Sequence, residues 1–459
     1  MKKFFLLSGT ALFIVGLFLF RTTAAEDPVD TQAVTTAGQT VVKKMYRPDK
    51  PEATVEFSQQ DPASLKPVLR WTKVESAVAY ELELFQENPG VYDDPRFRPA
   101  PFFSTSHIYV NGYNVDLSDQ LEQDYFYWRV HGLNLDGQRV GEDSDVQKVY
   151  VDRDKDIQLK PIPTSVFNQT AGSVLLYPVY AWIPVAGADK YEVEILDDLP
   201  ENPNDIEPSQ HRIDSAIAVG FDYYDPTPRV GRKPFYWRVR AMDQEGNPVG
   251  VYSDAGKFGV AAGAAFDVAT YGDSITHGGG AVSYSPSDWE YSYQHYLNFP
   301  VINLGKSGDT SATMVERFEQ DVLPFKPRYL IIMGGSNSMR GGYAAEDIIE
   351  DLTALKKKCL ANGIRPVFLT LPPINPDNIK RAFDEPTAED WQQERQKIND
   401  FIRMQDYIDV AQGMESPEGL LPTELATDGL HLDIKGKQMM AAAINANWGR
   451  ITGTASLGK

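Results

Sequence analysis

A tandem repeat in the first part of the chain is the feature that most restricts its possible folds. The run AYELEL at residues 79–84 matches KYEVEI at 190–195, and the run YWRV at 127–130 occurs again at 236–239. The matching runs lie about 110 residues apart, and so many matched positions are not expected by coincidence. The sequence therefore predicts two copies of one structural unit, arranged one after the other.

Each copy alternates apolar and charged side chains, which is the pattern of a half-buried β-strand. Tyr80, Leu82 and Leu84 are expected on one side of such a strand, and Glu81 and Glu83 on the other. Several short strands of this kind with turn residues between them, and no long helical pattern, are typical of an antiparallel β-sandwich. We therefore expect both copies to be all-β sandwiches.

Both copies resemble fibronectin type III domains in an early strand with a tryptophan, the YWRV strand, and a G-x-x-V-G-x-x-S-D turn that starts at Gly137 and again at Gly246. The resemblance implies two such domains, at residues 51–155 and 156–262. The tryptophans of the alternating strands are expected in the cores: Trp71, Trp128, Trp182 and Trp237. Two roles remain open for the pair, a spacer, which the sequence favours, or a module that docks onto a polysaccharide, a cell wall or a protein.

The charge balance and the cysteine content exclude several classes of protein. The 459 residues include 44 Lys and Arg against 64 Asp and Glu, which gives a net charge of −20. Binding to nucleic acid needs a basic face that neutralises phosphates, so no nucleic-acid partner is expected. The single cysteine, Cys359, can form neither an intramolecular disulfide nor a cysteine metal cluster.

The first 25 residues have the parts of a secretory signal peptide. Lys2 and Lys3 form a basic start, residues 4–20 are almost entirely apolar, and Thr23 and Ala25 stand where a cleavage site requires small residues. An uncleaved anchor is the alternative, because the apolar run is at the short end of the length that spans a bilayer. Both alternatives predict an exported protein, secreted or held in the cell envelope, with residues 26–50 as a polar linker.

The pattern changes after residue 262, where short apolar runs alternate with helical stretches. Strands are expected at 266–271, 301–304, 329–333, 367–371 and 407–410, and helices at 313–322, 345–362, 389–404 and 435–448. Buried strands separated by helices predict a parallel sheet with helices on both faces. In such sheets the chemistry gathers at the carboxyl ends of the strands.

The residues that follow these strands include the groups needed for acyl transfer. Ser274 lies in a glycine-flanked turn and could act as a nucleophile if a base removes its proton. His431 could be that base, with Asp428 holding its imidazole. The backbone N–H groups of Ser274 and Gly308 and the side-chain amide of Asn337 could form an oxyanion hole.

Four blocks in this order resemble the SGNH hydrolases, also called the GDSL lipase/esterase family. They are GDSIT at 272–276, NLGKSGDT at 303–310, GSN at 335–337 and DGLH at 428–431. The resemblance covers residues 265–459 and implies a three-layer, flavodoxin-like α/β fold and an esterase without metal or cofactor. The family's third block usually has an acid after its asparagine, where this chain has Ser338. Another register would put Ser336 in the asparagine slot, but Asn337 keeps the Gly-x-Asn pattern.

The substrate is less clearly indicated than the reaction. Aromatic residues at 284–296 follow the nucleophile and could stack on a sugar or pack a helix onto the sheet, and the loop expected at 371–384 could form one wall of the cleft. Export and the sandwich domains favour a carbohydrate O-acetylesterase that acts on a polysaccharide or a small ester. The alternatives are a lipase or lysophospholipase-type acyl esterase and a non-catalytic carbohydrate-binding or adhesion protein.

Overall fold

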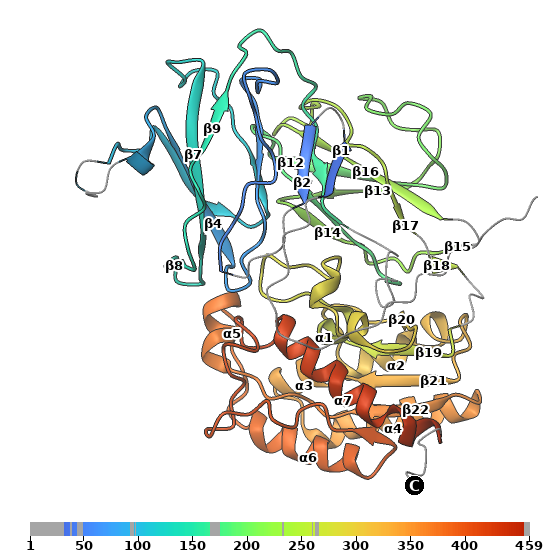
Figure 1. The fold of residues 1–459 in the computed structure, drawn as a ribbon. Helices are drawn as coiled ribbons and strands as arrows, with labels where there is room; N and C mark the ends of the chain where they lie inside the picture. The colour runs from blue at the N-terminus through green and yellow to red at the C-terminus, as the bar shows by residue number, and fades with distance from the viewer. Residues whose placement is uncertain are drawn as a thin grey trace, which may run out of the picture.

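The computed structural model has a β-rich part, at the top of Figure 1, above an α/β part that carries most of the helices. The structure describes residues 32–36, 39–43, 49–91, 96, 98–165, 175–231, 234–258, 260–261 and 266–453. The predicted signal at residues 1–25 lies outside the described residues. Within the described ranges, no helix is both long enough and apolar enough to cross a membrane.

The first β unit (residues 53–151) packs two sheets around one hydrophobic core. One sheet has the order β5-β4-β7-β8, with β9 also paired to β7, and the other pairs β3 with β6. The strands are β3 (Val68–Arg70), β4 (Ala79–Phe85), β5 (Phe103–Ile108), β6 (Gly112–Asn114), β7 (Tyr125–Leu133), β8 (Arg139–Val140) and β9 (Gln147–Tyr150), with a 3-10 turn at Pro89–Val91. Trp71 and Trp128 are buried in this core, as the alternating pattern predicts.

The second β unit (residues 159–258) repeats this arrangement. Its sheets have the orders β13-β12-β16-β17 and β10-β11-β14. The strands are β10 (Ile162–Pro163), β11 (Val179–Ile183), β12 (Lys190–Leu196), β13 (Arg212–Ala218), β14 (Asp222–Tyr224), β16 (Phe235–Met242) and β17 (Gly256–Phe258). Leu84 lies opposite Trp128 in the first unit, as Ile195 lies opposite Trp237 in the second, so the repeated runs form equivalent antiparallel pairs.

Two short pairings differ from the sequence-based expectations. Strands β1 (Gln32–Thr36) and β2 (Gln39–Lys43) form an antiparallel hairpin inside the range predicted to be a linker. Their threonine and valine content explains the difference, because β-branched residues favour strands. Strand β15 (Val230–Gly231) pairs in parallel with β18 (Val260–Ala261), where only antiparallel pairs were expected.

The α/β part contains the predicted parallel sheet, in the order β20-β19-β21-β22-β23. Its strands are β19 (Val268–Gly272), β20 (Ile302–Asn303), β21 (Tyr329–Met333), β22 (Arg365–Leu369) and β23 (Tyr407–Ile408). The described helices are α1 (Ser274–His277), α2 (Ser311–Asp321), α3 (Ser336–Arg340), α4 (Ala345–Ala361), α5 (Pro376–Phe383), α6 (Trp391–Arg403) and α7 (Ile434–Thr452), with 3-10 turns η3 (Trp289–Tyr291) and η4 (Tyr293–Tyr296). Helices α2 and α6 both pack against α4, whereas α7 contacts η3, η4 and β23.

Helix α5 occupies a stretch for which the sequence analysis predicts a loop. Asn375 caps this helix by accepting a hydrogen bond from the N–H of Asn378, and Pro376 stands at its first turn. Proline is well tolerated there because the first N–H groups of a helix have no partner within the helix. The prolines at 372–376 indicate a loop only if this capping signal is overlooked.

Candidate active site

The turn after strand β19 holds Ser274 at the start of helix α1. Asp273 caps this helix by accepting a hydrogen bond from the N–H of Ile275 at 3.0 Å. Gly272 passes so close to the next strand that a Cβ there would lie 2.1 Å from the carbonyl oxygen of Met333, so no larger residue fits. These contacts set the Ser274 hydroxyl at the carboxyl end of the sheet.

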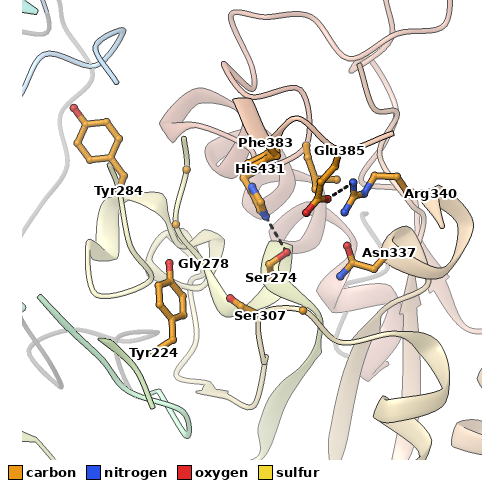
Figure 2. A pocket seen from close by; sticks show the side chains of 14 residues that line it. Tyr224, Ser274, Gly278, Tyr284, Ser307, Asn337, Arg340, Phe383, Glu385 and His431 are labelled. Atoms are coloured by element: carbon orange, nitrogen blue, oxygen red, sulfur yellow. Dashed lines mark hydrogen bonds and ion pairs between the residues drawn. The ribbon is translucent and has the colours of Figure 1, made fainter. Parts of the chain in front are cut away.

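The structure brings Ser274, His431 and Asp428 into one chain of contacts. Nε2 of His431 lies 2.9 Å from the Ser274 Oγ (Figure 2), and Nδ1 lies 2.8 Å from Oδ2 of Asp428. Asp428 is fully buried, and its Oδ1 accepts hydrogen bonds from the N–H groups of Leu430 and His431 at 2.8 and 2.7 Å. The carboxylate is therefore held rigidly against the imidazole, and the imidazole can take a proton from the serine.

The other predicted residues lie around the same hydroxyl. Gly308 and Asn337 line one cavity of about 250 Å³ together with Ser274 and His431. The Asn337 amide donates to the carbonyl oxygen of Asp309 at 2.9 Å, which orients the amide and leaves a second N–H. Ser336, the alternative in the sequence, is buried and is not part of the cavity lining.

Ser338, which stands where the family usually has an acid, lies away from the reacting groups. Its Oγ accepts a hydrogen bond from the N–H of Ser311 at 3.0 Å, at the first turn of helix α2. Ser311 in turn donates from its hydroxyl to Asp351 at 2.7 Å. The residue therefore ties α3 to α2, and its lack of charge does not alter the serine, histidine or oxyanion positions.

Sequence reasoning missed several residues that shape the cavity. Figure 2 shows Arg340 and Glu385 at the end near Asn337, joined by an ion pair of 2.6 Å, and Phe383 beside His431. Arg340 lies three residues after Asn337 on the same helix, and this i, i+3 spacing is the only sequence signal that could have found it. Tyr224 lines the opposite end and comes from strand β14 of the second β unit, which no local pattern predicts.

His277 lies directly behind this cavity and is fully enclosed. Its Nε2–H donates to the carbonyl oxygen of Tyr177 at 2.7 Å, and its Nδ1 accepts from the N–H of Ser307 at 3.3 Å. Burial lowers the pKa of His277 from 6.5 to about 4, so the ring is neutral near pH 7. In the structure, His277 ends α1 and holds the loop that carries Gly308.

Buried charges lie beneath the nucleophile. The Lys437 Nζ donates to the carbonyl oxygen of Ile275 at 2.8 Å, and burial lowers the pKa of this lysine to about 8. Burial also raises the pKa of Asp273 and of Asp433 to about 6. Lys437 and Asp273 thus contact helix α1 directly, whereas Asp433 accepts hydrogen bonds from Thr427, and none of the three is in the cavity lining. Among the described residues, no set of three or more His, Cys, Asp or Glu side chains is placed to hold a metal ion.

Comparison with known proteins finds a family match within the α/β part. Residues 270–439 match the model of the GDSL-like Lipase/Acylhydrolase family. The chain is 29% identical over 133 residues to "Uncharacterized lipoprotein YqeF" of Bacillus subtilis (strain 168), a match that covers 25% of this chain. It spans 51% of that curated relative, about half its length.

Similar solved structures cover the same part of the chain. A GDSL-like lipase from Bacteroides thetaiotaomicron has 21% identity and a TM-score of 0.34, over 40% of this chain and 88% of that one. A lipase/acylhydrolase from Enterococcus faecalis has 22% identity and a TM-score of 0.31, over 40% and 95%. A catalytic mutant of an acetylxylan esterase from Geobacillus stearothermophilus has 19% identity and a TM-score of 0.31, over 40% and 93%.

Proposed function

Because residues 270–439 form a hydrolase of the GDSL-like lipase/acylhydrolase family, whose members hydrolyse esters, we propose that this protein is an exported serine esterase. In this proposal Ser274 is the nucleophile, His431 the base and Asp428 the acid that orients it. Ser274, Gly308 and Asn337 form the oxyanion hole. The observation that carries the proposal is the chain of contacts from Asp428 through His431 to Ser274 at the edge of the cavity.

The geometry supports a two-step reaction. As the Ser274 oxygen attacks the ester carbonyl carbon, His431 accepts the hydroxyl proton at Nε2, and Asp428 stabilises the imidazolium through Nδ1–H. The negative charge on the former carbonyl oxygen is met by N–H donors of Ser274, Gly308 and Asn337. The tetrahedral intermediate collapses when His431 protonates the leaving alcohol. Water, activated by the same histidine, then releases the acid from the acyl-serine.

The mutation Ser274→Ala tests this assignment. It removes the nucleophile and leaves the helix cap at Asp273 and the buried surroundings in place, so the variant should fold and lose p-nitrophenyl acetate hydrolysis. Activity is compared with the far-ultraviolet circular dichroism and thermal midpoint of the same preparation. Undiminished turnover by a folded variant would refute the assignment of Ser274 as the nucleophile. Absence of turnover by the folded wild-type protein would instead favour the non-catalytic binding protein.

For the substrate we propose an O-acetyl ester of a carbohydrate. The cavity has room for a short acyl group, and its lining includes the polar side chains of Tyr224, Arg340 and Glu385. Release of acetate from acetylated xylan, pectin and peptidoglycan should therefore exceed hydrolysis of long-chain acyl esters. Preference for a long acyl chain would instead indicate a lipase or lysophospholipase-type enzyme.

The cellular location and the domain types complete the proposal. A cell-envelope location is supported by the relative of Bacillus subtilis, which is named a lipoprotein, and by the predicted signal at residues 1–25. The equivalent strand pairing of the two β units supports fibronectin type III-like domains at 51–155 and 156–262. The parallel sheet, with α7 packed apart from α2, α4 and α6, supports a three-layer, flavodoxin-like hydrolase domain at 265–459.

A further inference from the structure

The second β unit is built into the hydrolase sheet. Leu175 forms a parallel bridge with Asn303 of the edge strand β20, and the N–H of Leu176 donates to the carbonyl oxygen of Asn303 at 3.0 Å. Leu176 and Tyr177 are buried in the hydrophobic core of the α/β part. The Tyr177 hydroxyl donates to Oδ2 of the buried Asp321 at 2.7 Å. Leu176 and Tyr177 therefore belong to the core of the α/β part, whereas Leu175 belongs to the core of the second β unit. Elements that follow one another in a chain are usually neighbours in space, but Leu176 and Tyr177 precede the α/β part by about a hundred residues.

A buried histidine links this segment to the oxyanion region. His277 bonds the carbonyl oxygen of Tyr177 on one side and Ser307 on the other. Ser307 precedes Gly308, and both line the cavity. A displacement of residues 175–177 would therefore move a support of the oxyanion loop.

The first β unit holds another wall of the same cavity. The Tyr284 hydroxyl donates to the carbonyl oxygen of Val74 at 3.0 Å and lies 3.2 Å from the hydroxyl of Tyr80. Lys73 forms ion pairs with Asp288 and Glu290 in the segment that follows. Tyr284 lines the cavity, so both β units position its walls, which an independent spacer would not do.

Tyr224 brings the second β unit into the cavity itself. It ends strand β14, is 44% exposed, and is the one residue of the described β-rich part among those that line the cavity. Its ring meets that of His277 edge to face, with centroids 6.3 Å apart. Figure 2 shows Tyr224 and Tyr284 at the end of the cavity away from Arg340 and Glu385, with the small side chain of Ser307 drawn between the Tyr224 ring and Ser274.

An exposed aromatic ring with a hydroxyl at its tip suits one kind of ligand. The ring offers an apolar face and the hydroxyl offers a hydrogen bond, and a sugar ring has both an apolar C–H face and hydroxyls at its rim. We propose that Tyr224 is a substrate-binding residue supplied by the second β unit, and that it stacks on the sugar whose acetyl group Ser274 removes. This inference rests on the proposed carbohydrate esterase function.

The test compares two substrates in the mature chain with both β units present. Acetylated xylotriose carries a sugar, and p-nitrophenyl acetate delivers the same acetyl group without one. In Tyr224→Ala, the ratio of kcat/KM for the sugar ester to that for p-nitrophenyl acetate should fall about tenfold, mainly through KM. Tyr224→Phe, which keeps the ring, should retain most of this ratio. Tyr236→Ala, in strand β16 of the same unit and outside the cavity lining, should leave both substrates within about twofold of wild type.

The outcomes distinguish a failure of the Tyr224 proposal from a failure of the proposed carbohydrate esterase function. If the wild-type protein deacetylates the sugar and Tyr224→Ala keeps the wild-type ratio, the role of Tyr224 is refuted and the esterase function stands. Equal losses in the Ala and Phe variants would refute stacking by the ring. If the wild-type protein hydrolyses p-nitrophenyl acetate but no acetylated sugar, the carbohydrate assignment fails, and the sugar-binding role of Tyr224 fails with it.

Discussion

Acidification should lower the free energy of unfolding through protonation of His277, a side chain that joins the second β unit to the loop of Gly308. The ring is buried, donates from Nε2–H to Tyr177 and accepts at Nδ1 from the N–H of Ser307. A second proton would place a positive charge in a site shielded from water, and the positive charges of Arg317, Lys437 and Lys306 also oppose it. For these reasons the pKa of His277 is lowered from 6.5 to about 4.

The size of the effect follows from the two pKa values. Between pH 6.5 and pH 4 an unfolded chain binds a proton at this histidine that the folded chain does not, so the free energy of unfolding falls as the pH falls. Each pH unit over which only the unfolded chain binds the proton is worth about 1.4 kcal/mol. Because the unfolded histidine is half protonated at pH 6.5 and the folded one begins to bind a proton near pH 4.5, the loss between pH 7 and 4.5 is about 2.4 kcal/mol. Well above pH 6.5 both states have a neutral ring, and the full stability is present.

His277→Gln provides the matched variant. A glutamine amide can donate to the Tyr177 carbonyl oxygen and accept from the Ser307 N–H, but it does not titrate. The assay is urea unfolding of both proteins at pH 7, 6, 5 and 4.5, monitored by tryptophan fluorescence. Carboxyl groups such as Asp273 titrate in both proteins, so the difference between the two unfolding free energies isolates His277. Between pH 7 and 4.5 wild type should lose about 2.4 kcal/mol relative to the variant, and parallel pH curves would refute the reasoning.

Three further substitutions test the site and its link to the β-rich part. Asn337→Ala removes the proposed oxyanion donor and should lower kcat for p-nitrophenyl acetate about 100- to 1,000-fold. Ser336→Ala should change kcat less than about twofold. Equal effects of the two substitutions would contradict the choice of Asn337 over Ser336. Asp428→Asn should lower kcat about 10,000-fold with little change in thermal midpoint, because the amide carries no negative charge to stabilise the imidazolium and its NH2 group favours the wrong tautomer of His431. A near-normal kcat would exclude this role. Tyr177→Phe removes the hydrogen bond to the buried Asp321 carboxylate and should reduce the unfolding free energy, measured by denaturant titration, by about 1.5–3 kcal/mol. An unchanged unfolding free energy would show that this contact adds no stability.

The sequence predicted those features that depend on short-range patterns. Period-two alternation at residues 79–84 and 190–195 identified the strands, and the structure pairs both runs in equivalent registers. The apolar runs between helices predicted the parallel sheet, whose carboxyl ends collect the motifs at Ser274, Asn337 and His431. The motif blocks were sufficient to locate these candidate residues because each block specifies its own local turn. Gly272 is an example, since the close approach of the Met333 carbonyl oxygen leaves no room for a side chain there.

Features that join distant parts of the chain could not be predicted in this way. Leu176 and Tyr177 lie in a β unit by sequence but in the hydrolase core by contact, and His277 acquires its role only when it meets Tyr177. Tyr224 ends an ordinary short strand, and nothing nearby in the sequence marks it as part of a cavity.

The sequence by itself therefore determined the two β units, the parallel sheet and the candidate serine, histidine and acid, because periodicity and local turns specify these. Only the tertiary structure decided that the β units help to form the cavity. That outcome depends on how separately folded surfaces pack together, and the residues in contact are 100 and 210 positions apart in the chain, with no repeating pattern to connect them.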